Sequence, residues 1–125
     1  MVCYLIDDDR DDQEIFAMAL KEVDKKVHLV TADSGIDALE TLRGKHLLPD
    51  IIFLDINMPR MDGWQCLGQL NQMEHLAKTP IVIYSTSESG IGIRARSDFH
   101  TFLTKQPKIT ELARKLNELF IHINP

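Results

Sequence analysis

The chain has 125 residues and a net charge of −5, which suits one globular domain with a real core. It has no Lys/Arg run that would neutralise nucleic-acid phosphates, and no apolar run of membrane-spanning length. The N-terminus lacks the layout of a secretory signal, so we expect a cytoplasmic protein with neither nucleic-acid nor membrane partners.

Apolar runs and helical stripes alternate along the chain. Unbroken apolar runs predict strands, and apolar residues spaced three or four apart predict helices. The predicted strands span residues 2–6, 27–32, 51–54, 81–84 and 101–104. The predicted helices span about 11–24, then from the N-cap Ser34 to the closing Gly44, then 64–73, 88–98 and 109–120. The helix at 88–98 is the weakest, since Gly90 and Gly92 disfavour a long helix.

This order predicts a single α/β domain over residues 1–125. Alternating strands and helices imply a parallel sheet, because each connection crosses over in a right-handed sense. The crossovers place helices on both faces of that sheet. No repeat, low-complexity segment or linker divides the chain.

The strand at 51–54 organises the rest of the prediction. Its four apolar residues show no polar face, which is typical of a strand buried on both sides. It therefore brings Asp55 to its C-terminal end, where open α/β sheets bind ligands. Pro59 and the pair Asp62-Gly63 then turn the chain away, and we assign that pair to turn formation only.

Other predicted strands also end in polar residues: Asp7 and Asp8, Ser85, and Lys105. In a parallel sheet these ends share one edge with Asp55. Carboxylates held this close repel one another unless a cation compensates them, and oxygen ligands of this kind suit Mg²⁺. A metal and a lysine beside one carboxylate would form a site for phosphoryl transfer onto Asp55.

Three further groups of residues have simpler explanations. Acids that start the first predicted helix, Asp9, Asp11 and Asp12, are expected to serve its N-terminus only. Two cysteines, Cys3 and Cys66, fall on buried elements and are expected to be reduced. The five histidines lack the close spacing of a zinc site.

The chain resembles the receiver domain of two-component response regulators along essentially its whole length. The resemblance is carried by Leu5-Ile6-Asp7-Asp8-Asp9, Leu54-Asp55-Ile56-Asn57-Met58-Pro59-Arg60-Met61-Asp62-Gly63, Ser85 and Phe102-Leu103-Thr104-Lys105. Residues 60–87 are also similar to the stand-alone regulators that partner bacterial phytochromes. The resemblance implies a flavodoxin-like, doubly wound sheet of five parallel strands in the order 2-1-3-4-5, with five helices on both faces.

The resemblance also implies a metal site and a phosphoacceptor. Asp55 would accept the phosphoryl group. Asp8 would bind Mg²⁺, or another divalent cation such as Mn²⁺, and Asp7 would help to hold it. The main-chain carbonyl of Asn57 would be a further ligand, so the implied metal-binding residues are Asp7, Asp8, Asp55 and Asn57.

Three residues would take part in catalysis and switching. Lys105 would contact a phosphate oxygen, Ser85 would turn its hydroxyl toward the phosphoryl group, and Phe102 would change position with it.

The donor would be a phosphohistidine on a sensor histidine kinase or a histidine phosphotransfer protein. The domain would catalyse its own phosphorylation and dephosphorylation, switch a surface that binds a downstream protein, and carry no output domain of its own. Similar domains can form homodimers.

Two departures from the family pattern open alternatives. Gln106 follows Lys105 where the family usually has proline, so either this peptide is cis or the loop takes another path. The segment from Ser85 to Lys105 is also short. A pseudo-receiver, which binds proteins without being phosphorylated, is therefore the second hypothesis. A haloacid dehalogenase-type phosphatase is unlike this chain, because Asn57 occupies the position of its second acid.

Overall fold

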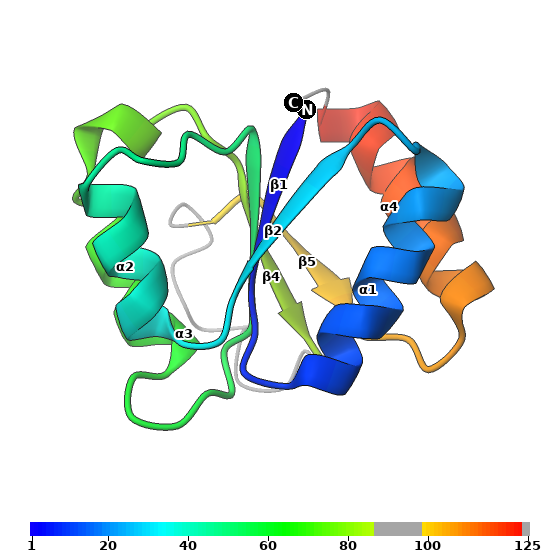
Figure 1. Ribbon diagram of the computed structural model, residues 1–125, viewed down its shortest axis with the longest axis horizontal. Coiled ribbons are helices and arrows are strands. Elements are labelled where there is room, and N and C mark those ends of the chain that lie inside the picture. Colours follow the sequence, from blue (N-terminus) through cyan, green and yellow to red (C-terminus); the bar gives the residue numbers. More distant parts are fainter. Residues whose placement is uncertain (87–98, 124–125) are drawn as a thin grey trace.

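The computed structural model describes residues 1–86 and 99–123. Its centre is a five-stranded parallel sheet with strand order β2-β1-β3-β4-β5, which confirms the expected topology. The strands are β1 (Val2–Ile6), β2 (His28–Ala32), β3 (Ile51–Leu54), β4 (Ile81–Ser85) and β5 (Thr101–Thr104). All five strands run in the same direction, so their C-terminal ends lie along one edge, at the bottom of Figure 1.

Helices cover both faces of this sheet. The four α-helices of the described residues are α1 (Arg10–Val23), α2 (Gly35–Arg43), α3 (Gly63–Leu70) and α4 (Ile109–Ile123). In Figure 1, α2 and α3 lie on one side of the sheet and α1 and α4 on the other. The helix predicted at 88–98 lies outside the described residues.

The sheet separates two hydrophobic cores because strand side chains alternate between its faces. In β3, Ile52 and Leu54 join the core beneath α2 and α3, whereas Ile51 and Phe53 join the core beneath α1 and α4. All four side chains are fully buried. The unbroken apolar run thus has the predicted cause, burial on both faces.

The described helices follow the sequence pattern except at two ends, and one of these is α4, which continues past residue 120 to Ile123. Ser34 is the N-cap of α2 and Gly44 its C-cap, as predicted. The third helix was expected to reach Met73, but α3 ends at Leu70 and a short 3-10 helix, η1 (Glu74–Leu76), follows. Met73 is nevertheless buried in the same core as α3, so its spacing reflects burial rather than continued helix.

Both cysteines are buried and free, as expected. Burial raises the pKa of Cys3 to about 12 and that of Cys66 to about 11, so both thiols stay protonated at neutral pH. Separately, no helix among residues 1–86 and 99–123 combines the length and apolar character needed to cross a bilayer.

The connection from β3 to α3 is tightly built. Arg60 has a left-handed backbone, φ 67°, inside a three-residue turn that the Met61 N–H closes on the Pro59 carbonyl at 2.8 Å. Asp62 caps α3 by accepting from the Gln65 N–H, and the Gln65 side chain accepts from the Asp62 N–H. The assignment of Asp62 to turn formation only is therefore wrong.

Gly63, the first residue of α3, packs directly against the chain that follows β3. A Cβ at this position would lie 2.3 Å from Ile56 Cα and 2.5 Å from the Asp55 carbonyl oxygen. Backbone atoms cannot yield as a flexible side chain can, so only glycine fits. Gly68, later in the same helix, has no atom within 4 Å of the corresponding position.

These two glycines give a matched pair of substitutions. Gly63→Ala is expected to lower the free energy of unfolding by roughly 1–3 kcal/mol, because the added methyl overpacks the β3–α3 connection. Gly68→Ala is expected to raise it by about 0.5–1 kcal/mol, because alanine favours the helix. Urea unfolding followed by circular dichroism measures both, and equal effects at the two positions would contradict this packing.

Candidate functional site

The ends of the strands are fixed by the sheet itself. Three residues just beyond a strand donate their backbone N–H to the last residue of a neighbouring strand. These bonds join Asp7 to Ala32 at 3.0 Å, Asp55 to Ile6 at 2.9 Å and Lys105 to Ser85 at 2.7 Å. The parallel hydrogen-bond ladder therefore holds the two acids and the lysine at one edge.

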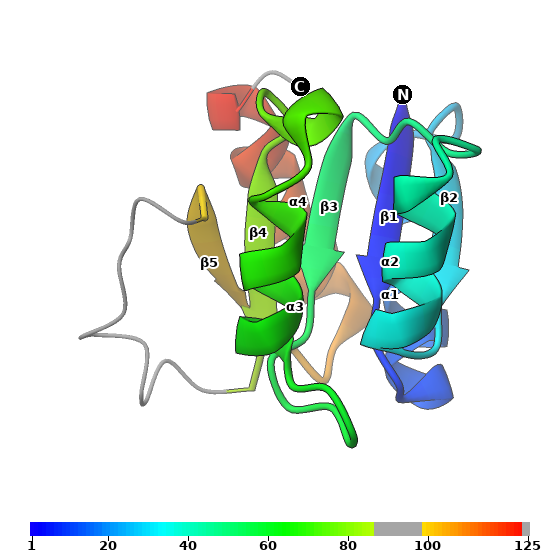
Figure 2. The ribbon, with the colours of Figure 1, turned by 90° about the vertical axis from the view of Figure 1, so that its left-hand side faces the viewer.

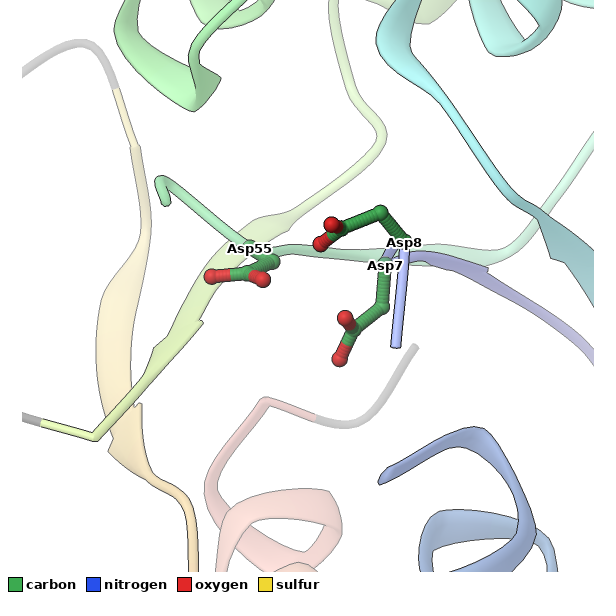
Figure 3. Close-up of side chains that lie close together, drawn as sticks. All are labelled: Asp7, Asp8 and Asp55. Atoms are coloured by element: carbon green, nitrogen blue, oxygen red, sulfur yellow. The ribbon is translucent and has the colours of Figure 1, made fainter. Parts of the chain in front are cut away.

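Three of the predicted acids meet there. Asp7, Asp8 and Asp55 each offer a carboxylate oxygen within 4.8 Å of the others, and Figure 3 shows the three side chains clustered beyond the strand ends. Asp7 is fully buried and Asp55 is 4% exposed, whereas Asp8 is exposed. Asp8 and Asp55 line a pocket of about 220 Å³ together with Asn57, Lys105 and Thr86.

Lys105 reaches this cluster from the end of β5. Its Nζ lies 2.9 Å from Asp7 Oδ2 and 3.4 Å from Asp55 Oδ2, and its side chain is only 11% exposed. The nearest carboxylate, however, is that of Asp12 in the first turn of α1, at 2.8 Å. The interpretation of Asp12 as a helix-start acid only is therefore wrong.

Gln106, the residue after Lys105, does not turn the lysine side chain away from the acid cluster. The described residues contain no cis peptide, so the Lys105–Gln106 bond is trans and the loop takes the alternative path. The Gln106 side chain donates to the Thr104 carbonyl at 3.3 Å. On this path Lys105 still contacts Asp55.

The surrounding charges hold Lys105 in its cationic form. Burial alone would lower the pKa of Lys105, but the close contacts with Asp12 and Asp7 and the charge of Asp55 outweigh it and raise the pKa above its usual value. The ammonium also lies 5.3 Å from the centre of the Tyr84 ring, which is within cation–π range.

Asn57 and Ser85 form the other side of the site. The Asn57 N–H donates to Asp55 Oδ1 at 3.1 Å, which fixes the orientation of that carboxylate. The Asn57 side-chain amide donates to Ser85 Oγ at 3.4 Å, and Ser85 is 1% exposed. The sequence pattern gave no sign of this side-chain contact.

Phe102 lies within β5, ahead of Lys105 in the chain. It pairs in register with Ile83 on β4 and packs, partly buried, against the core beneath α2 and α3. Trp64 packs against the same core, with its ring centre 6.1 Å from that of Phe99.

A larger hollow, of about 790 Å³, lies at the other end of the sheet. Residues at the N-terminal ends of β3 and β4, such as Asp50 and Pro80, line it together with His100. The acid cluster is the better candidate site, because buried charges and shifted pKa values converge there.

Asp7 shows what the burial of an acid costs the metal-free protein. Burial raises the pKa of Asp7 from 3.8 to about 6, and the contacts with Lys105 and the Asp9 N–H only partly oppose this shift. An acid whose pKa is higher in the folded state destabilises that state when it is ionised. The penalty is absent below about pH 3.8, grows between pH 3.8 and about 6, and is constant above.

Replacing this acid should therefore stabilise the metal-free fold. Asp7→Asn is expected to raise the free energy of unfolding at pH 7.5 by roughly 1–3 kcal/mol, with the gain shrinking toward pH 4. Urea titrations in a chelator at several pH values measure it. Asp11→Asn, an exposed acid in the first turn of α1, is the control. A gain that does not depend on pH would contradict this account.

Comparisons with known proteins identify the family and the fold of the chain. The model of the response regulator receiver domain matches residues 3–117. The response regulator Rcp1 of Synechocystis sp. is 26% identical over 118 residues, which cover 89% of this chain and 80% of Rcp1. The Mn²⁺-bound structure of Rcp1 superposes with a TM-score of 0.79 at 24% identity, over 95% of this chain and 91% of that one.

Two further similarities come from a solved structure and from a longer protein. The phosphorylated cyanobacterial phytochrome response regulator RcpA superposes with a TM-score of 0.82 at 25% identity, over 95% of this chain and 90% of RcpA. "Probable histidine kinase 6" of Oryza sativa subsp. japonica is 40% identical over 70 residues, 56% of this chain but only 7% of that protein. With the family model spanning almost all of the chain, the protein belongs to the response regulator receiver domain family of two-component signalling.

Proposed function

We propose that residues 1–125 form a receiver domain that accepts a phosphoryl group on Asp55 from a phosphohistidine. The observation that carries this proposal is the surrounding of the Asp55 carboxylate. It is nearly buried, lines a pocket, has a lysine ammonium at 3.4 Å, and has an oxygen of each of two further carboxylates within 4.8 Å. The phosphorylated state of the similar protein RcpA supports the proposal.

The acid cluster fits a divalent cation. Asp7 Oδ2 is buried and accepts no hydrogen bond from the described residues, although Lys105 Nζ lies 2.9 Å away as an ion pair. A buried carboxylate oxygen without a hydrogen bond is suited to bind a further cation. Asp7, Asp8, Asp55 and the Asn57 carbonyl would hold Mg²⁺ or Mn²⁺, since all four offer oxygen. The Mn²⁺-bound form of Rcp1 supports this assignment.

Phosphoryl transfer to Asp55 requires little acid–base catalysis from the protein. A carboxylate oxygen of Asp55 forms a bond to phosphorus while the bond from phosphorus to the imidazole nitrogen breaks, and that nitrogen keeps the electron pair. Lys105 offsets the charge of the phosphoryl oxygens in the loose transition state. A bound cation would supply further positive charge there. In the later hydrolysis, water attacks phosphorus, the bond from phosphorus to the Asp55 oxygen breaks, and inorganic phosphate leaves, which restores the Asp55 carboxylate.

Ser85 and Phe102 would couple this chemistry to a surface. A phosphoryl group adds about −1.5 to −2 charge and new hydrogen-bond acceptors at Asp55. The Ser85 hydroxyl, buried and linked to the site through Asn57, is suited to donate to one of them. Phe102 lies on β5, the strand that pairs with Ser85's strand β4. It would change position together with Ser85, which would bias a protein-binding surface between two states.

Receiver domains pair with histidine kinases, and we propose a sensor histidine kinase or a histidine phosphotransfer protein as the donor. The downstream partner would be a protein, and a second copy of the chain could be that partner in a homodimer. The pseudo-receiver alternative is not favoured, since Lys105 contacts Asp55 in spite of Gln106.

Phosphorylation is tested by intact mass after incubation with Mg²⁺ and acetyl phosphate. We expect the wild type to gain the mass of one phosphoryl group and to lose it slowly by hydrolysis. Asp55→Asn and a chelator should each abolish the gain. Asp50→Asn is the matched control. Asp50 directly precedes β3 and Asp55 directly follows it, so the same substitution is made at the opposite end of the same strand. An unlabelled wild type, or equal labelling of Asp55→Asn, would refute the proposal.

A further inference from the structure

Asp12 contacts the site although it is not part of the acid cluster beyond the strands. It comes from the first turn of α1, and its Oδ2 lies 2.8 Å from Lys105 Nζ, closer than Asp7 or Asp55. The Asp12 side chain is 29% exposed and the Lys105 side chain 11%, so the pair is largely shielded from water. Of the three carboxylates, only that of Asp12 is neither a proposed phosphoacceptor nor a proposed metal ligand.

The position of Lys105 creates a conflict in the metal-free site. Its ammonium sits beside Asp7 Oδ2 and Asp55 Oδ2, oxygens that the proposed metal site would use. A divalent cation entering there would compete with the ammonium for these oxygens and would repel it at short range. Another anionic partner for the ammonium would relieve this competition.

We propose that Asp12 is the positioning residue for Lys105. Its carboxylate holds the ammonium at the edge of the acid cluster and leaves Asp7 and Asp55 able to bind a divalent cation. This inference depends on the metal site of the proposed function. Asp12 acts through Lys105 and does not itself touch the metal or the phosphoryl group.

The local structure suits this role. Asp9 caps α1 and accepts from the Asp12 N–H at 3.2 Å, so the backbone of Asp12 is fixed. Lys105 donates hydrogen bonds to Asp12 Oδ2 at 2.8 Å and to Asp55 Oδ2 at a longer 3.4 Å, whereas its contact with Asp7 Oδ2 is an ion pair. The shorter hydrogen bond of the ammonium is therefore the one to Asp12, and the Asp7 oxygen keeps its capacity to bind a metal.

A double-mutant cycle on metal binding tests the inference. Calorimetric titration of the metal-free protein with Mg²⁺ gives the dissociation constant. Asp12→Asn is expected to weaken binding roughly 10-fold, because the freed ammonium turns to the carboxylates. In the Lys105→Met background the same substitution should change binding less than about twofold, because no ammonium remains to compete.

The control is Asp11→Asn, which removes an exposed charge from the same turn and should leave Mg²⁺ binding unchanged in both backgrounds. An equal weakening by Asp12→Asn with and without Lys105 would overturn the inference, because Asp12 would then act directly on the cation. No weakening in the wild-type background would overturn it as well.

A second measurement needs no metal. In a chelator, Asp12→Asn should lower the urea midpoint of the wild type but not that of Lys105→Met, where Asp12 would face only other carboxylates. The same shift in both backgrounds would show that the pair does not form and would overturn the inference. If both cycles give the expected coupling while acetyl phosphate leaves Asp55 unlabelled, the role of Asp12 stands and the proposed phosphorylation falls.

Discussion

Buried carboxylates that lack a matching cation are the constraint around which this edge of the molecule is built. Asp7 and Asp55 have almost no contact with water, and Asp8 and Asp12 add negative charge beside them. Within residues 1–86 and 99–123, Lys105 is the cation paired with this cluster. One ammonium cannot balance four acids, so the fold keeps a local excess of negative charge that favours either proton uptake or a bound cation.

Much of the fold could be predicted from the sequence, because its signals are local. The apolar run 51–54 had to be a strand buried on both faces, and the structure confirms it. The residues Asp7, Asp8, Asp55, Ser85 and Lys105 follow strands, and parallel strands bring such residues to one edge. The strand order 2-1-3-4-5, in contrast, came from the resemblance to receiver domains, since neither composition nor periodicity says which strands are neighbours.

What the sequence did not reveal depends on contacts between distant segments. An acid such as Asp12 is common in the first turn of a helix, so its position needs no further explanation in the sequence. Its pairing with Lys105, 93 positions away, is visible neither in the apolar periodicity nor in the order of the strand-end residues. One signal was available: α1 begins directly after β1, so its first turn must lie at the same edge as Asp7. The expected extension of α3 to Met73 was wrong because helix spacing and burial in one core look alike in a sequence.

The separation of the two cores by the sheet affects how the sequences of the two helical layers can change during evolution. Side chains packed beneath α2 and α3, such as Leu39, share no core cluster with those beneath α1 and α4, such as Leu112. Substitutions in the two layers should therefore combine additively in stability, because distant residues without common neighbours seldom interact. Each helical layer can then acquire new partner surfaces through its own series of mutations, while the strand ends between them keep their chemistry.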